Sequence, residues 1–418
     1  MMISTISPSH PSARAKFNMA SFQTLDGLGS LLSRPETSHI DLSLVENFLI
    51  RDELAMICKT IINNKLYLQQ LASQNCPGAD ATLREGFAKF LNNYFNPSTP
   101  ILAHHIVTGP GAASCLDALL TSICGRGDDG LEYSLRFSSS IQPVLVRGQD
   151  PLVGSPEVST ADFVASLGDA MDNALCEIRA LILANPHKQS GQCYPQEFLE
   201  GCLKFCQQRN IHFISDETYA LTTYRCAEIS APIPFTSSLS LHTRALACDI
   251  SRIHTVWSVD KDFGAGGFHV GCMVSQGNQD LHRKLSLASN TPVSSLSATF
   301  ATALLMSPTL PFLITLNSAR LAEAYIIITS FFIRHGINYI PTSTGLTIYA
   351  QLDPSAQTLE DDKSTLETLK DAGVLVSPAL EFRDTNDGCE GWVRLSFAME
   401  KHLLTEALRR IEVALSLG

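Results

Sequence analysis

The sequence predicts an α/β fold with a ligand site at the carboxyl ends of its strands. Three stretches support this interpretation, because each is a short apolar run that ends in polar or glycine-rich residues: 101–112, 211–219 and 254–271. Helical periodicity lies between them, as expected where strands alternate with helices. In an open α/β sheet, the loops at the carboxyl ends of the strands line the ligand crevice.

Length and composition set the bounds of this interpretation. A chain of 418 residues with 45% hydrophobic residues can bury a large core, as two or three domains or as one large subunit with a lobe. The net charge of -11 argues against a nucleic-acid or anionic-membrane partner, since both need a basic face. The twelve cysteines are dispersed and predict reduced core thiols of a cytoplasmic protein, with no zinc site.

No run of residues reaches the roughly twenty apolar residues that a membrane span needs. The nearest, residues 324–333, is shorter and fits a buried helix. Residues 1–25 are rich in serine and contain Arg14 and Lys16. They predict a flexible tail, with a weak organelle leader as the alternative.

Periodicity assigns the main elements in order. Helices are expected within 40–64 after an extended start, and over 83–94, 113–124, 196–208, 316–336 and 407–416, with a helix and then a strand within 161–181. Strands are expected over 101–107, 211–219, 345–352 and 392–397, and a serine-rich segment leads into a helix within 286–305. The helix over 316–336 is expected to cross between two lobes.

Two strand ends carry the residues that indicate chemistry. Lys261 follows one apolar run and precedes a glycine-rich turn, whereas Asp216 and Tyr219 follow another. Lys261 with Asp262 could by itself be a solvated turn. Together, an amine, an acid and a phenol suit pyridoxal phosphate: the amine bonds to the aldehyde, the acid keeps the ring nitrogen protonated, and the phenol hydrogen-bonds the ring oxygen.

These stretches resemble a known family. The segments SDETY (215–219) and SVDKDFGAGGFHVG (258–271) resemble motifs of class I/II aminotransferases, especially 1-aminocyclopropane-1-carboxylate synthase and its fungal secondary-metabolism relatives. Further matches are DLSLVENFLIRDEL (41–54), VTGPGAAS (107–114), ANPH (184–187), SSLSA (294–298) and GWVRLSFA (391–398). The resemblance therefore covers about residues 40 to 415.

The resemblance implies an architecture and a set of partners. It implies a three-layer αβα large domain with a mostly parallel sheet, a smaller α+β lobe, pyridoxal 5'-phosphate as cofactor, an amino-acid-type substrate and a homodimer. The expected parts are a flexible tail (1–25), an N-terminal segment of the small lobe and dimer region (26–95), a large cofactor-binding domain (96–306) and a C-terminal small domain (307–418).

The resemblance also assigns residues to the binding of the cofactor phosphate. It implies that Gly109, Gly111 and Ala112 bind the phosphate at a helix N-terminus, where free N–H groups and the helix dipole favour an anion. A generic strand–helix turn is the alternative. Ser258 and His269 complete the implied phosphate site.

The chain departs from the family pattern around this phosphate. Pro110 stands where the family has a hydroxyl, Asp260 where it has a second serine, and His269 where it has an arginine. The segment LASQNCPGAD (71–80) also lacks the tyrosine that reaches the partner subunit's cofactor. A lost charged hydrogen bond of roughly 1.5–3 kcal/mol would weaken cofactor binding by about 10 to 150 fold.

The remaining implied residues surround the ring and the substrate. Tyr133 is implied to stack on the ring, and Lys188, at the position of a family asparagine, to donate to the ring oxygen. Substrate contacts are implied for Glu46, Asn47, Asn185 and Arg394, the last binding the α-carboxylate. The alternatives are a surface tyrosine, a surface acid with a helix cap, and a structural ion pair of Arg394.

We therefore expect a pyridoxal-phosphate enzyme that acts at the α-carbon of an amino acid or a derived metabolite. Lys261, Asp216 and Tyr219 are the expected catalytic residues. The reaction type stays open between transamination and carbon–sulfur elimination, because one cofactor chemistry leads to both. The alternative from another class is a catalytically impaired homologue kept as a binding or scaffold protein, which the changed residues favour.

Overall fold

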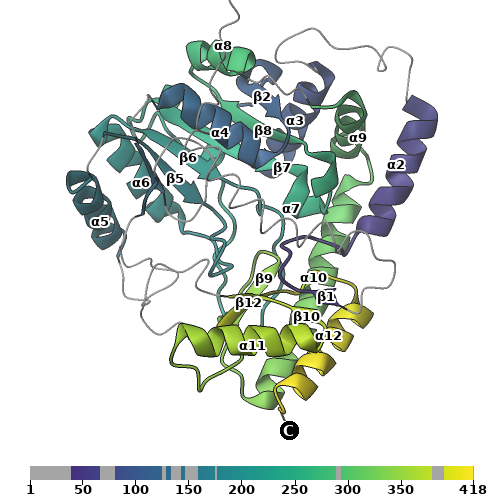
Figure 1. Ribbon diagram of the computed structural model, residues 1–418. Coiled ribbons are helices and arrows are strands. Elements are labelled where there is room, and N and C mark those ends of the chain that lie inside the picture. Colours follow the sequence, from purple (N-terminus) through teal and green to yellow (C-terminus); the bar gives the residue numbers. More distant parts are fainter. Residues whose placement is uncertain are drawn as a thin grey trace, which may run out of the picture.

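The computed structural model describes residues 39–65, 81–124, 129–132, 143–145, 159–174, 177–288, 293–378 and 390–417. The chain forms a larger body around a seven-stranded sheet and a smaller body around two short sheets (Figure 1). Tyr133 and the expected N-terminal tail lie outside the described residues.

The larger sheet has the strand order β2-β8-β7-β6-β5-β3-β4. The strands are β2 (Ile106–Gly109), β3 (Asp129–Glu132), β4 (Pro143–Leu145), β5 (Ile178–Ala184), β6 (His212–Asp216), β7 (Ile253–Ser258) and β8 (Gly271–Ser275). Neighbours from β4 to β7 pair in parallel, whereas β8 is antiparallel to β7 and β2. A mostly parallel sheet is confirmed, and the carboxyl ends of β2, β5, β6 and β7 share one edge.

Helices cover both faces of this sheet, which confirms the three-layer prediction. They are α3 (Ala81–Tyr94), α4 (Ala112–Ile123), α5 (Thr160–Asp172), α6 (Gln196–Arg209), α8 (Gln279–Ala288) and α9 (Ser295–Leu305). Val256 packs with α4 and α8, whereas its neighbour Trp257 packs with α3 and α9. Successive residues of a strand point to opposite faces, so β7 serves both cores.

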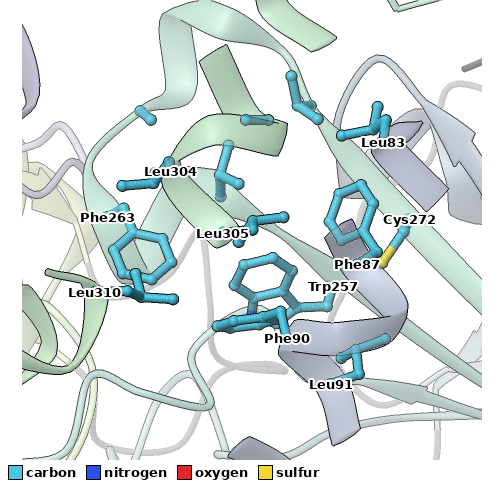
Figure 2. Packing of buried hydrophobic residues seen from close by; sticks show 14 of the residues in the cluster. Leu83, Phe87, Phe90, Leu91, Trp257, Phe263, Cys272, Leu304, Leu305 and Leu310 are labelled. Carbon is cyan, nitrogen blue, oxygen red and sulfur yellow. The ribbon is translucent and has the colours of Figure 1, made fainter. Parts of the chain in front are cut away.

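Trp257 is the centre of the aromatic core on the α3 and α9 side. Figure 2 shows it beside Phe90 and Phe87, with ring centroids 4.5 Å and 6.0 Å away, respectively. Phe263, at the end of the short helix α7 (Val259–Phe263), lies 6.1 Å from the Trp257 ring. The turn that carries Lys261 is therefore attached to a rigid core.

The smaller body is an α+β lobe. It contains the sheet β11-β12-β9 and the pair β1-β10, with bounds β1 (Ile40–Asp41), β9 (Thr347–Gln351), β10 (Val374–Leu375), β11 (Ser377–Pro378) and β12 (Trp392–Ser396). Its helices are α11 (Leu359–Asp371), α12 (Lys401–Ala414) and the end of α10 (Leu310–His335), and α2 (Arg51–Lys65) stands beside the two bodies (Figure 1).

Helix α10 joins the two bodies, as expected. Leu310 and Leu313 at its start belong to the core of the larger body, whereas Tyr325 and Phe332 belong to that of the smaller one. Among the described helices, α10 is long and apolar enough to cross a membrane by length and composition. Because its residues pack in both cores, α10 is a core helix of the fold.

Two expected boundaries differ from the structure. The strand expected over 101–107 starts only at Ile106, because a 3-10 turn, Ala103–His105, precedes it. The Leu102 N–H donates to His105 Nδ1 at 3.1 Å, which closes that turn. The expected N-terminal part 26–95 contributes to both bodies, since β1 pairs with β10 and α3 packs in the core of the larger body.

The cysteines behave as reduced core thiols in the described part of the chain. Nine are described, none of these nine is in a disulfide, and seven are buried. Burial raises the pKa of Cys115 and of Cys193 to about 12. Because the thiolate is the nucleophile, these thiols are chemically inert at neutral pH.

A pair of histidines, His254 buried and His212 half-buried, lies at the opposite end of β6 and β7 from the strand ends described above. His212 Nδ1 and His254 Nε2 are 2.9 Å apart, and the rings stack with centroids 5.1 Å apart. His254 is fully buried. Burial lowers the pKa of His212 to about 4 and that of His254 well below its usual value.

We expect the free energy of unfolding to fall as the pH falls below about 6.5, where the unfolded histidines bind protons and the folded ones do not. Each histidine can contribute up to about 1.4 kcal/mol per pH unit. Urea denaturation from pH 8.5 to 5.0 measures this slope. In His254→Asn, the free energy of unfolding should depend less steeply on pH below about 6.5. Above about pH 7.5, it should differ from that of wild type by a constant amount. An unchanged slope below pH 6.5 would contradict the assignment.

Candidate active site

The strand ends at one edge of the larger sheet bring together the residues that the sequence assigned to the cofactor. Gly271 of β8 pairs with Gly109 of β2 on one side and with Ser258 of β7 on the other. Asp216 of β6 pairs with Val256, which lies two residues before Ser258 in β7. Every second side chain of a strand points to the same face of the sheet. Asp216 lies two residues after Ile214 and Ser258 two residues after Val256, and the side chains of Ile214 and Val256 pack with α4. Both side chains therefore project toward the α4 layer.

The glycine turn before α4 forms a backbone cradle at this edge. Gly111 caps the helix with a φ of 92°, a conformation that favours glycine. A Cβ on Gly271 would lie 2.5 Å from the Gly111 carbonyl carbon, so the turn rests directly on β8. The first N–H groups of α4 lack acceptors within the helix and suit a phosphate.

Asp216 carries a buried negative charge with three donors. Its Oδ1 accepts from the Thr218 N–H and hydroxyl at 3.2 Å and 2.8 Å, and its Oδ2 accepts from Lys188 Nζ at 2.7 Å. Burial acts to raise the pKa of Asp216, but the Lys188 ammonium and Thr218 keep it below its usual value. The sequence assigned Lys188 to the cofactor's ring oxygen; in the structure its ammonium contacts Asp216.

Lys261 lies in α7 with its amine turned toward the N-terminal segment of the chain. Its Nζ donates to the Val45 carbonyl at 2.7 Å and lies 3.3 Å from Asp260 Oδ2. Asp260, which stands at the position of a family serine, is thus a counter-ion of the lysine. Asp260 adds a negative charge beside Lys261, whereas Lys188 adds a positive charge beside Asp216.

Arg394 reaches the same N-terminal segment from the smaller body. Its guanidinium donates to the Ser43 carbonyl and to the Ser377 hydroxyl, both at 2.9 Å. Residues 43–45 therefore receive hydrogen bonds from both Arg394 and Lys261. The amine and the guanidinium, which are far apart in sequence, converge on one short segment.

Tyr219 lies among these charged groups. It is buried, and burial raises the pKa of its phenol. The charges of Asp260 and Asp216 raise the pKa further, whereas that of Arg394 lowers it. Charges from both bodies therefore act on one phenol.

Asn47 holds the lysine turn in place. Its side-chain amide is fully buried and donates to Asn317 Oδ1 at 2.9 Å and to the Lys261 carbonyl at 3.4 Å. A Cβ on Gly264, which follows in the same turn with a φ of 67°, would lie 2.0 Å from the Asn47 carbonyl oxygen. The contacts of Asn47 in the structure position the backbone of Lys261.

Three other expected site residues have different surroundings. The Asn185 amide is buried and binds the Thr236 carbonyl and the Tyr194 N–H, so it anchors the end of β5. Glu46 is exposed and pairs with Arg51. His269 is exposed in the left-handed region with a φ of 51°. Asn185 and Glu46 thus have partners within the protein, and their contact with the substrate stays a prediction.

The sequence analysis assigned no site role to two acids that are buried in the structure, and the solvated turn that it allowed for Asp262 is wrong. Asp262 accepts from Trp257 Nε1 at 2.7 Å and from the Leu221 N–H at 3.0 Å, and burial raises its pKa to about 8. Burial also raises the pKa of Glu217 to about 7, although four donors from Ser215, Ser237 and Ser238 lower it. The adjacent acids at 216–217 and 260–262 were a signal, but their partners are distant in sequence.

Comparison with known proteins decides the family of this site. Residues 58–411 match the model of the family described as Aminotransferase class I and II. The chain belongs to this family. Its enzymes are dependent on pyridoxal phosphate, so the expected cofactor is supported by the family and by the fold.

Relatives in fungi and solved structures agree with this assignment. The chain is 41% identical to the protein named "Probable aminotransferase aclI" of Aspergillus oryzae, over 92% of each chain. It is 32% identical to "Probable aminotransferase sirI" of Leptosphaeria maculans, over 90% of this chain and 91% of the relative. The aspartate aminotransferase of Rhizobium meliloti shares the fold, with a TM-score of 0.73, 16% identity and 98% and 100% coverage.

The residues at the strand ends fit this cofactor with two departures. The glycine cradle and Ser258 suit its phosphate, the buried Asp216 suits its ring nitrogen, and the Lys261 amine suits its aldehyde. Asp260, in contrast, adds an anion, and His269 supplies a titratable ring where an arginine is expected. We therefore expect a weaker hold on the phosphate than the family pattern would give.

We expect Asn47→Ala to lower the free energy of unfolding by about 1–3 kcal/mol, because Asn317 and the lysine turn lose a buried donor. The same change should weaken cofactor binding, since the backbone of Lys261 is released. Denaturant titration and titration with pyridoxal phosphate measure the two effects. The exposed Asn63 on α2 is the matched control, and Asn63→Ala should stay within about 0.5 kcal/mol. Equal losses of stability and of cofactor affinity in Asn47→Ala and Asn63→Ala would contradict the role of Asn47 in supporting the lysine turn.

Proposed function

We propose that the chain is a pyridoxal-phosphate-dependent aminotransferase that acts on an amino acid, or an amino-acid-derived metabolite, with a free α-carboxylate. The observation that carries this proposal is the convergence of Lys261 and Arg394 on residues 43–45 of the N-terminal segment. A role in secondary metabolism is supported by a further relative, "Trimodular acetylaranotin synthesis protein ataIMG" of Aspergillus terreus, which is 31% identical over 94% of this chain and 41% of its own length.

Each group has a role that follows from its position. When bound, pyridoxal phosphate supplies an electron sink for charge that develops at the substrate α-carbon. The Asp216 carboxylate holds a proton at the ring nitrogen, and Lys261 Nζ removes and returns the α-proton as a general base and acid. The guanidinium of Arg394 exchanges the Ser43 carbonyl for the substrate carboxylate, a stronger acceptor because it is charged.

Tyr219 and Asp260 adjust this proton transfer. The raised pKa of Tyr219 keeps its phenol protonated, so it serves as a hydrogen-bond donor at neutral pH. The Asp260 carboxylate lies 3.3 Å from Lys261 Nζ and is the counter-ion of the amine that carries the proton.

The binding or scaffold alternative is less well supported. The charged groups that the chemistry needs are present and buried or half-buried, and Asp216 and Lys261 each have an ion-pair partner. The relatives at 41% and 32% identity are named as aminotransferases. We also propose a homodimer, as is usual in this family, and a cytoplasmic location, which is supported by the absence of disulfides among the nine described cysteines.

Lys261→Ala should abolish the visible absorbance band of the lysine-bound cofactor and reduce turnover by several orders of magnitude. Wild-type protein incubated with amino acids and 2-oxoglutarate should form a new amino acid. Release of ammonia and a thiol from cysteine conjugates would identify a carbon–sulfur lyase instead. A wild-type protein that shows no such band with added cofactor would contradict the proposed function.

Arg394→Lys should raise KM for the amino substrate by about 10 to 150 fold with a smaller effect on kcat, because lysine keeps the charge but loses the two-point contact. Steady-state kinetics measure this split. Arg51→Lys is the control, since the exposed Arg51 pairs with Glu46. A change in kcat alone would show that Arg394 does not bind the carboxylate.

A further inference from the structure

Lys188 is a charged residue of the site whose position is fixed by its own turn. The His187 N–H donates to the Gln192 carbonyl at 2.8 Å and the Gly191 N–H to the His187 carbonyl at 3.0 Å, which closes the turn. The Gly191 carbonyl accepts from Ser343 and Thr344 of the smaller body. A Cβ on Gly191 would lie 2.5 Å from Thr342 Cβ, so the turn is seated tightly.

The fixed turn delivers the Lys188 ammonium to one oxygen of the buried acid. Lys188 Nζ lies 2.7 Å from Asp216 Oδ2, whereas both Thr218 donors occupy Oδ1. The Asp216 side chain is 5% exposed and that of Lys188 is 23% exposed. The pair is therefore poorly screened by water, and each charge strongly affects the other.

A carboxylate oxygen can accept two hydrogen bonds, so Oδ2 retains one acceptor position beside Lys188. The ring nitrogen of the cofactor needs a carboxylate, and Oδ1 already has two donors. A protonated ring at Oδ2 would stand next to the ammonium, and the two like charges would repel. Each cation reduces the attraction that Asp216 offers to the other.

We propose that Lys188 is a positioning residue that shares the Asp216 carboxylate with the cofactor's ring nitrogen and so weakens the hold of the protein on its cofactor. This inference rests on the proposed function, because it assumes that the ring nitrogen approaches Asp216. It differs from the role that the sequence assigned to Lys188, which was a donor to the ring oxygen. The two roles predict opposite effects when the charge is removed.

The test compares wild-type protein with Lys188→Met, Lys188→Gln and Lys188→Arg in the full chain freed of cofactor. Equilibrium titration with pyridoxal phosphate gives Kd, and thermal unfolding is followed with and without saturating cofactor. Lys188→Gln keeps a long donor without the charge, so it guards against a Lys188→Met variant that fails to fold. Lys188→Arg retains the positive charge.

Both neutral variants should bind pyridoxal phosphate about tenfold more tightly, which corresponds to about 1.4 kcal/mol. They should also be less stable without cofactor and gain more stability on loading, whereas Lys188→Arg should resemble wild type. An unchanged Kd would show a purely structural ion pair, and a weaker Kd would show a direct ligand of the cofactor. Either result overturns the proposal.

Failure of the proposed function would look different. Wild-type protein would then show no cofactor binding at any concentration, before any variant is compared. That outcome would overturn the shared-carboxylate proposal together with the proposed function. Normal wild-type binding with unchanged variants would overturn the role of Lys188 alone.

Discussion

The ion pair between Asp216 and Lys188 is the interaction on which the site depends. A buried carboxylate is expensive without a partner, and here an ammonium and two Thr218 donors keep it charged. The β6 strand brings Asp216 to the sheet edge opposite Val256, two residues before Ser258, whose partner in β8 is Gly271. The charge is thus built into the sheet, and the loops of both bodies are arranged around it.

A second pair of charges repeats this arrangement at the lysine. Asp260 lies 3.3 Å from Lys261 Nζ, so each of the two residues that carry the chemistry has an added counter-ion. The two added charges, of Lys188 and Asp260, have opposite signs and offset each other. The groups that the family uses are kept, but each added counter-ion weakens the electrostatic interaction of its partner with the cofactor or the substrate.

The N-terminal segment connects the two bodies at this point. Its carbonyl groups accept from Lys261 and Arg394, and Asn47 holds the backbone of the lysine turn. The site therefore needs the larger sheet, the smaller lobe and residues 43–47 together. None of these parts contains the complete set of groups.

From the sequence by itself, periodicity predicted the order of elements, and the family motifs predicted the mostly parallel sheet and the roles of Lys261, Asp216 and Arg394, because both signals lie in neighbouring residues. Only the tertiary structure decided which group each of them contacts. Lys188 lies on Asp216, Asn47 supports the backbone of Lys261, and Asp262 bonds Trp257. Most of these partners lie far apart in sequence, and burial, register and chain crossing bring them together.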